Sequence, residues 1–442
     1  MLKISVSGVR GIIGTDIGPS DFVSLTRAFS RYLGKGAYIV AHDTRSSNEM
    51  VYNAVISALS AEGCEVYGLG LAPTPSVFRM VRQKSFKGGI IVTASHNPPE
   101  WNGLKFVLDE GRSMYSNELN HFIKEYSRRK SNMVISTNEI RHIDYSSYLS
   151  DLISFVGKDS CKGVRVGIDS GGGVGSIFAS ELFRSLGCNV VSINDSPGIF
   201  PRGLDPSTSD LDSLSQIVID KRCDIGFAYD CDADRVILVN DQGKILAPDM
   251  AFLLCVNSFL KKGFVGKVAA SIDTSTAINE IASLYGTEVI HSPVGEANVV
   301  EKILGEKCAI GGEGSSGGVI IPNFVLCRDG ILSSSLILKS IKEEGSLERI
   351  IKEIPIHSQV RTKIHCSKEN SLRIIGEFIT KYPESDLTDG VKITIGEKAS
   401  ILIRYSATED VIRISVEAEN QEKSERLARK YMSEIKRILS QY

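Results

Sequence analysis

A short β-branched run, a glycine-rich or polar turn and a helical stretch follow one another repeatedly through most of the chain. Three such units cover residues 37–61, 164–186 and 267–285, and each starts with a strand pattern and ends with a helix pattern. A further strand is predicted at 89–92, again followed by a polar turn. Strands that alternate with helices predict α/β layers with largely parallel sheets.

The last part of the chain has another order of elements. Residues 400–404 and 411–417 alternate as strands do, and residues 422–439 place their apolar side chains on one helical stripe. Strands grouped ahead of a closing helix predict a separate α+β domain that begins near residue 358.

The length of 442 residues exceeds what one hydrophobic core usually supports, so about three domains are expected. The predicted boundaries fall near residue 158, ahead of the strand at 164, and near residue 248, ahead of an apolar helix at 250–260.

Charge and cysteine content exclude several classes of function. The chain has 51 basic and 53 acidic residues, which gives no electrostatic reason to expect a nucleic acid or an anionic membrane as a partner. No apolar run is long enough for a transmembrane helix, and the N-terminal residues lack the pattern of a signal peptide. Nine scattered cysteines without a C-x-x-C pair are typical of buried thiols in a reducing, cytoplasmic protein.

The first motif with chemical content is Thr93–Pro98, TASHNP, directly after the predicted strand 89–92. A serine where a buried strand meets a loop lies at the edge of an α/β sheet where ligands bind. Taken alone, an ordinary polar turn is the better reading, and the flanking glycines of a G-x-S-x-G nucleophile elbow are missing.

The second motif is Asp230–Arg235, DCDADR, directly before an apolar strand pattern at 236–239. Carboxylates at every second position share one face of an extended segment, and such hard oxygen ligands suit Mg²⁺ or Ca²⁺. An EF-hand loop is excluded, because Arg235 stands at its glycine position and Asp241 at its final glutamate position. A solvated acidic turn remains the alternative.

Two more loops carry polar groups suited to a sugar phosphate. Gly311–Gly318, GGEGSSGG, combines close backbone approach with a carboxylate and two hydroxyls, although a flexible turn is an equally good interpretation. Arg404–Thr408, RYSAT, offers an arginine and hydroxyls between two strands, with Arg413 nearby, as a phosphate site needs. An exposed hairpin turn is the alternative there. The glycine-rich segment 169–175 does not keep the G-x-G-x-x-G register and is interpreted as a tight turn.

Together, in this order, the four loops resemble those of the α-D-phosphohexomutases, the family of phosphoglucomutases, phosphomannomutases and phosphoglucosamine mutases. The stretch Ser95–Lys105 and the opening Ser7–Gly11 add to the resemblance, which covers essentially the whole chain. It implies an isomerase that interconverts hexose 1-phosphate and hexose 6-phosphate, with a phosphoserine, a hexose 1,6-bisphosphate intermediate and one Mg²⁺ per chain. The implied fold has three related α/β domains with mixed, largely parallel sheets plus a C-terminal α+β domain around a central cleft, at 1–157, 158–248, 249–357 and 358–442.

The resemblance also implies roles for individual residues. Ser95 is the implied phosphoserine, with Lys105 and Arg10 as the basic catalytic residues beside the transferring phosphoryl group; of the two, Lys105 is the better candidate proton carrier. The implied metal ligands are Ser95, Asp230, Asp232 and Asp234. The implied substrate-binding residues are Arg235, Glu313, Ser315, Ser316, Arg404, Ser406, Ala407, Thr408 and Arg413.

Three positions depart from the family pattern. Gly318 stands where many bacterial members have a histidine, so any acid–base work of that histidine passes elsewhere or is absent. The sugar loop is one residue longer, which leaves open whether Ser315 or Ser316 contacts the sugar. Ala407 replaces the usual glycine or asparagine of the phosphate loop, and Asp410 replaces a common proline.

The same four loops could also serve two other functions. In a phosphosugar hydrolase, water would take the phosphoryl group from Ser95, although such an enzyme has no need of a clamp for a retained bisphosphate. A weakly catalytic homologue that only binds sugar phosphates is the other alternative, motivated by Gly318 and Ala407. The expected small-molecule partner is a hexose phosphate, and neither the preferred sugar nor the oligomeric state has a signal in the sequence.

Overall fold

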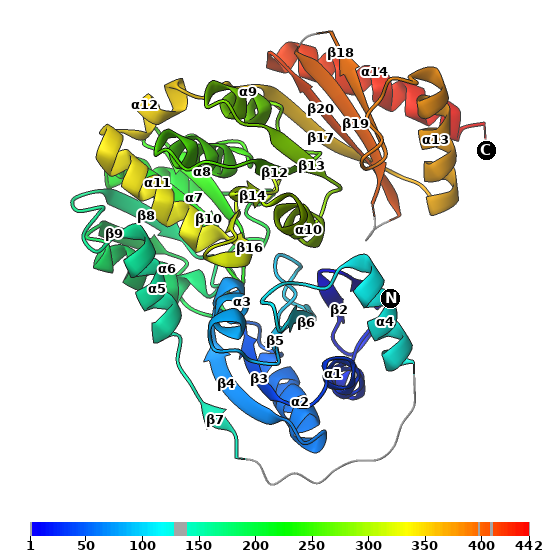
Figure 1. Cartoon of the computed structure of the whole chain (residues 1–442). Helices are drawn as coiled ribbons and strands as arrows, with labels where there is room; N and C mark the ends of the chain where they lie inside the picture. The colour runs from blue at the N-terminus through cyan, green and yellow to red at the C-terminus, as the bar shows by residue number, and fades with distance from the viewer. Residues whose placement is uncertain (1, 128–138, 397, 407–409, 442) are drawn as a thin grey trace.

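The computed structural model describes residues 2–127, 139–396, 398–406 and 410–441, which form four sheets with their helices. In Figure 1 the first domain lies below, and the second, third and fourth follow one another in an arc above it. Three sheets are mixed, with parallel strands, and the fourth is antiparallel. The predicted fold of three α/β domains and a C-terminal α+β domain is confirmed.

The first sheet has seven strands in the order β1-β2-β6-β5-β3-β4-β7. Its helices α1, α2 and α4 cover one face, where Phe22, Phe29 and Phe122 are buried, and α3 packs on the other face through Val77 and Val81. The elements are β1 (Lys3–Ser5), β2 (Gly8–Ile12), α1 (Pro19–Leu33), β3 (Ala37–His42), α2 (Asn48–Ala61), β4 (Glu65–Leu71), α3 (Thr74–Gln83), β5 (Gly88–Val92), β6 (Trp101–Leu108), α4 (Ser116–Tyr126) and β7 (Arg141–His142).

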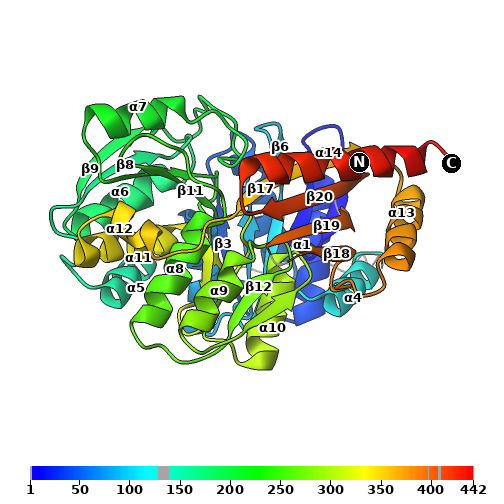
Figure 2. The same ribbon diagram turned by 90° about the horizontal axis from the view of Figure 1, so that it is seen from above.

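The second sheet has the order β11-β10-β8-β9, in which only β11 is antiparallel to its neighbour. Helix α7 packs on one face and α6 on the other, and Figure 2 shows α7 at the outside of the molecule. The elements are α5 (Ser146–Val156), β8 (Arg165–Asp169), α6 (Gly175–Ser185), β9 (Asn189–Ile193), α7 (Asp212–Asp220), β10 (Ile225–Tyr229) and β11 (Val236–Asn240). Helix α5 lies against α6, with the Tyr145 and Phe178 rings 4.1 Å apart.

The third sheet has the order β13-β12-β14-β15-β16. The apolar helix α8 packs with this sheet in one buried cluster. The elements are α8 (Met250–Lys261), β12 (Val268–Ser271), α9 (Ala277–Leu284), β13 (Val289–Ser292), α10 (Glu296–Glu306), β14 (Ile310–Gly312), β15 (Val319–Ile321), β16 (Val325–Asp329), α11 (Gly330–Glu344) and α12 (Leu347–Lys352).

The fourth sheet has the order β17-β20-β19-β18, and its helices α13 and α14 share one buried cluster with it. The elements are β17 (Ser358–His365), α13 (Lys368–Lys381), β18 (Val391–Ile395), β19 (Ala399–Tyr405), β20 (Val411–Ala418) and α14 (Gln421–Leu439). The strands and the helix predicted for this region are all present. No helix in the described part of the chain is long and apolar enough to cross a bilayer.

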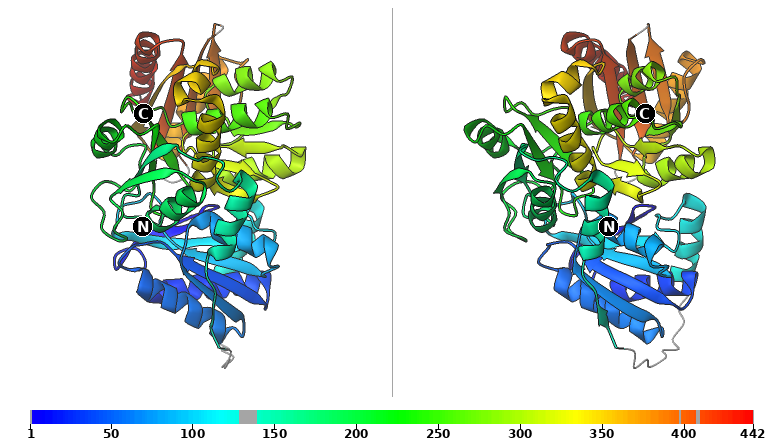
Figure 3. Two further views of the ribbon diagram at one scale, coloured as in Figure 1. Left: turned by 90° about the vertical axis from the view of Figure 1, so that its left-hand side faces the viewer. Right: turned by 60° about the vertical axis from the view of Figure 1, so that its left-hand side comes forward.

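Polar side chains join the domains directly. Arg79 of α3 lies over the Phe324 ring at 4.2 Å and donates to the Phe324 carbonyl, which connects the first domain to the third. Glu417 of β20 accepts a hydrogen bond from the Thr276 amide at 2.9 Å, which connects the fourth domain to the third. The two views of Figure 3 show the resulting stack, with the first domain against the second and third.

The core of the third domain supports the loop that the sequence assigns to sugar binding. Phe252 of α8 is fully buried, and its ring lies so close to Gly312 that a Cβ there would come within 2.8 Å of it. The close approach of α8 to β14 therefore requires glycine at position 312.

We predict that Phe252→Ala lowers the free energy of unfolding of the third domain by about 3–5 kcal/mol, because it leaves a cavity beneath β14. Differential scanning calorimetry measures the effect as a shift of that domain's transition, since a four-domain chain is not expected to unfold in one step. Phe264→Ala is the matched control, because Phe264 is in the same domain but half exposed. Equal shifts for the two variants would contradict this packing.

Candidate active site

Ser95 lies just past the end of β5, in a backbone conformation that is uncommon for residues other than glycine. Its φ is +51°, and its side chain is buried. The Ser95 amide donates to Thr93 Oγ1 at 2.8 Å, and Thr93 in turn donates to the Asp43 carboxylate at 2.6 Å. The loop therefore holds the serine in one orientation at the edge of the first sheet.

The buried side chain of Arg45 binds the backbone of this loop. The Arg45 guanidinium pairs with Asp43 at 3.1 Å and donates to the carbonyls of Ser95, Asn97, Pro98 and Trp101 at 2.6–3.1 Å. Both charged side chains are fully buried, so their pairing is required for the loop to fold in this form.

The serine meets the second domain at the loop between β10 and β11. The Ser95 hydroxyl donates to Asp230 Oδ2 at 2.7 Å, and the Thr74 amide at the start of α3 donates to the Asp232 carbonyl at 3.0 Å. The predicted phosphoserine and the predicted metal ligands are thus brought together.

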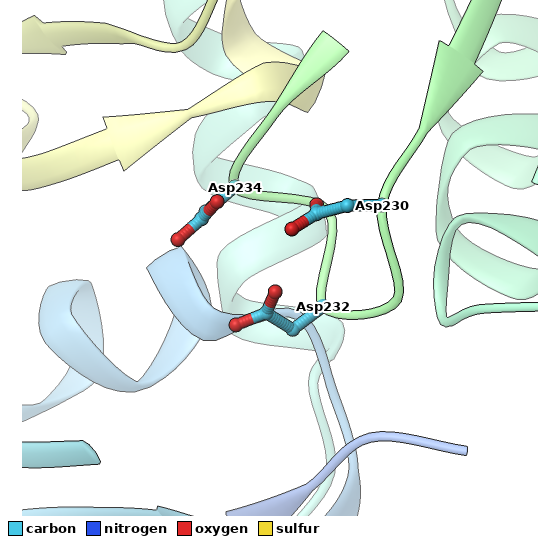
Figure 4. A group of neighbouring side chains, drawn as sticks. All are labelled: Asp230, Asp232 and Asp234. Carbon is cyan, nitrogen blue, oxygen red and sulfur yellow. The ribbon is translucent and has the colours of Figure 1, made fainter. Parts of the chain in front are cut away.

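The three aspartates of this loop form a buried carboxylate cluster. One oxygen of each lies within 4.8 Å of the others, and Figure 4 shows the three side chains on the same side of the loop. Oδ1 of Asp232 and Oδ1 of Asp234 are buried without a hydrogen-bond partner among the described residues. Burial raises the pKa of Asp230 well above its ordinary value, and the charges of Asp234 and Asp232 act in the same direction. Three buried carboxylates, two of which keep an oxygen without a hydrogen-bond partner among the described residues, fit a Mg²⁺ ion.

Basic side chains surround the aspartates. Lys105 Nζ, from β6, lies 2.6 Å from Asp232 Oδ2 and 2.7 Å from Asp234 Oδ2. Burial disfavours the charge of Lys105, but the two carboxylates outweigh this effect and raise its pKa. Arg10, from β2, donates to the Asn97 side chain at 3.1 Å, and burial lowers its pKa.

Arg235 and His96 complete this part of the site. The Arg235 side chain lies 3.9 Å from the Asp234 carboxylate and 3.6 Å from that of Asp205. His96 Nδ1 is 3.4 Å from Ser95 Oγ. Burial, together with the positive charges of Arg235 and Arg10, lowers the pKa of His96 well below its ordinary value.

The predicted sugar loop lies against the metal loop. Glu313 accepts from the Gly295 amide at 2.7 Å and from Arg328 at 2.8 Å, and the Val236 amide donates to the Ser316 carbonyl at 3.1 Å. The Ser316 hydroxyl is buried and donates to the Glu313 carbonyl at 3.2 Å, whereas Ser315 is partly exposed.

The predicted phosphate loop, in the fourth domain, is linked to the predicted sugar loop by the contacts of Asp389. Arg404 Nη1 lies 3.8 Å from Asp389, which accepts from the Val294 amide at 3.0 Å, next to the Gly295 that binds Glu313. Arg413 stands directly across from Arg404 in the pair β19–β20, and the Ser406 side chain is buried. Ala407 and Thr408 lie outside the described residues.

Four residues at the site were missed by the sequence reasoning: Arg45, Thr74, Arg328 and Asp389. Arg45 had a usable signal, because the segment 42–45 follows β3, the parallel neighbour of the strand that ends at the serine loop. The others become visible only when the domains pack, since each pairs with a residue at least 94 positions away.

All four domains of the chain match domain profiles described as phosphoglucomutase/phosphomannomutase. Domain I matches residues 1–133, domain II 144–243, domain III 247–356 and the C-terminal domain 351–433. The chain belongs to this family. It is therefore a phosphohexomutase, an isomerase.

Two relatives of similar identity carry different names. The chain is 33% identical over 444 residues to a "Probable phosphoglucosamine mutase" of Pyrococcus furiosus, with 98% of the chain and 97% of the relative covered. It is 34% identical over 445 residues to a "Phosphoglucomutase/phosphomannomutase" of Thermococcus kodakarensis, with 96% and 95% covered.

Solved structures of family members share the fold. A phosphoglucomutase/phosphomannomutase family protein of Burkholderia thailandensis has a TM-score of 0.84 at 22% identity, covering 99% of this chain and 98% of that one. An N-acetylphosphoglucosamine mutase of Aspergillus fumigatus, in complex with GlcNAc-6P and magnesium, has a TM-score of 0.61 at 12% identity, covering 99% and 95%.

The phosphohexomutase has no room for a side chain at position 318. A Cβ on Gly318 would lie 2.2 Å from the Asp234 carbonyl oxygen and 2.8 Å from Arg328 Cβ. A histidine built on this backbone would meet the same atoms, so glycine here is a requirement of the packing between the sugar loop and the metal loop.

We predict that Gly318→Ala lowers the Mg²⁺ affinity by about tenfold or more, because the new methyl group displaces the loop that holds the aspartates. Isothermal titration calorimetry with MgCl₂ measures this affinity. Gly305→Ala is the control, since a Cβ there meets no atom within 4 Å and alanine stabilises a helix by about 0.5–1 kcal/mol. Unchanged Mg²⁺ affinity in Gly318→Ala would contradict the packing argument.

Proposed function

We propose that this phosphohexomutase interconverts hexose 1-phosphate and hexose 6-phosphate through a phosphoserine at Ser95 and a hexose 1,6-bisphosphate. The observation that carries the proposal is the 2.7 Å hydrogen bond from Ser95 to Asp230, within a buried cluster of three carboxylates and nearby cations. A phosphoryl group on Ser95 would carry about −1.5 to −2 charge. It therefore needs the positive charge that the nearby cations supply.

The proposed ligands of one Mg²⁺ are Asp230, Asp232, Asp234 and a phosphoryl oxygen on Ser95. When bound, Mg²⁺ offsets charge that develops on the transferring phosphoryl group. The magnesium in the Aspergillus relative supports this assignment.

Lys105 and Arg10 are proposed to stabilise negative charge at the phosphoryl group. Lys105 was expected to carry a proton. Its Nζ contacts the carboxylates of Asp232 and Asp234, which raise its pKa and favour its charged form, so we propose an electrostatic role for it. A loose transition state requires little early removal of the proton from the attacking hydroxyl. The Ser95 Oγ–P bond breaks as a sugar oxygen forms its bond to phosphorus, and the sugar's proton is passed on to the Ser95 oxygen.

The bisphosphate then turns over so that its other phosphate can return to Ser95. Arg404, Ser406, Ala407, Thr408, Arg413 and Arg235 are proposed to bind whichever phosphate is not reacting. Glu313 is proposed to accept a hydrogen bond from a sugar hydroxyl. Ser315 is the better second contact, because the Ser316 hydroxyl already donates to a backbone carbonyl. One phosphate site serves both ends of the sugar, which a mutase needs and a hydrolase does not.

The proposed substrates are phosphates of glucose, mannose or glucosamine, because relatives of nearly equal identity are named for different sugars. These sugars differ at C2, and a comparison of kcat/KM for the three ranks them. We also propose a cytoplasmic location, supported by nine free thiols of which eight are buried.

We predict that the protein converts glucose 1-phosphate into glucose 6-phosphate when Mg²⁺ and a trace of glucose 1,6-bisphosphate are present. Phosphorus NMR of the reaction mixture distinguishes a mutase from the two alternatives. A hydrolase would release inorganic phosphate, and a binding protein would leave glucose 1-phosphate unconverted. Excess chelator should stop the reaction. Conversion that persists in chelator would contradict the metal assignment, and inorganic phosphate as the main product would contradict the mutase assignment.

A further inference from the structure

Arg328, at the end of β16, binds three carboxylates from three separate segments of the chain. Its Nη2 lies 3.3 Å from Asp234 in the metal loop, its Nη1 lies 2.8 Å from Glu313 in the sugar loop, and its Nε lies 3.2 Å from Glu296 at the start of α10. One guanidinium thus spans a gap between the second and third domains.

The two glutamates depend on this arginine for their charge balance. Glu313 and Glu296 are buried, and among the described residues Arg328 is the one cation in an ion pair with either of them. Asp234, by contrast, also pairs with Lys105. Loss of the guanidinium would therefore free the Glu313 carboxylate first and remove one of three cationic contacts of Asp234, which keeps Lys105 and Arg235.

The absence of a side chain at position 318 permits this arrangement. A Cβ on Gly318 would come within 2.8 Å of Arg328 Cβ as well as 2.2 Å from the Asp234 carbonyl. Glycine at this point allows β16 and the metal loop to approach closely enough for Arg328 to contact both loops.

We infer that Arg328 is a positioning residue that fixes the Glu313 carboxylate toward the sugar and ties it to the metal loop, so that one side chain supports both hexose-phosphate binding and Mg²⁺ binding. The inference rests on the proposed roles of Glu313 and the three aspartates. Guanidinium geometry is essential to it, because three donors of a planar group point in fixed, different directions.

The test measures binding rather than turnover. Titration calorimetry of Arg328→Met with MgCl₂ alone, and of the metal-free protein with glucose 6-phosphate alone, should show both affinities reduced by about 10–100-fold. Arg79→Met is the matched control, because Arg79 also bridges domains through Asp151 and the Phe324 carbonyl but lies outside the site. Its two affinities should stay within about twofold of the wild type.

A double-mutant cycle separates positioning from a general loss of stability. Glu313→Gln should weaken glucose 6-phosphate binding in the wild-type background, and should add less than about twofold when Arg328 is already Met. Fully multiplicative losses would show that Arg328 acts independently of Glu313 and would overturn the inference.

Arg328→Lys keeps the inference testable if Arg328→Met fails to fold. The lysine retains the charge, but its compact ammonium cannot bridge three carboxylates, so both affinities should still fall by about tenfold. Wild-type affinities in Arg328→Lys would overturn the inference. If instead the wild type binds both ligands but forms no hexose 6-phosphate from the 1-phosphates of glucose, mannose or glucosamine, the proposed mutase reaction fails while the role of Arg328 in binding is still decided.

Discussion

The site depends on how the carboxylates of the β10–β11 loop are neutralised. Asp230, Asp232 and Asp234 are all buried, and burial of an unpaired charge costs several kcal/mol even after relaxation. Their partners come from elsewhere: Lys105 and the Ser95 hydroxyl from the first domain and Arg328 from the third. Side chains from three domains thus meet this charge requirement at one loop, beside the apolar core that the same domains share.

The same requirement explains why the serine loop is built so rigidly. Ser95 can donate to Asp230 only because Arg45 and Thr93 hold its backbone in a left-handed conformation. Functional residues are often held in such uncommon conformations by their surroundings. The fourth domain reaches this region through Asp389, which accepts from the Val294 amide and lies 3.8 Å from Arg404.

Local patterns located the strands beside the reactive loops, and the family resemblance assigned the chemistry of the loops, since each loop taken alone also fitted an ordinary turn. The strands that precede Ser95 and follow Asp234 are short and apolar, and each loop begins or ends at such a strand, so hydrophobic periodicity located them. Arg328 and Asp389 could not be found in this way, because each also contacts a segment 94 or 95 positions away that only domain packing brings near. Gly318 was recognised as a departure from the family, but its physical reason, contact with the Asp234 carbonyl, required coordinates.

A rapid-quench experiment with glucose 1,6-bisphosphate labelled in its phosphates tests most directly whether the phosphoryl group passes through Ser95. The account predicts that label appears on the peptide containing Ser95 and then moves to hexose 6-phosphate at least as fast as steady-state turnover, once unlabelled glucose 1-phosphate is added. Ser95→Ala should take up no label and show no turnover, while Ser433→Ala, on an exposed face of α14, should behave as wild type. Turnover without label at Ser95, or robust activity of Ser95→Ala, would contradict the account.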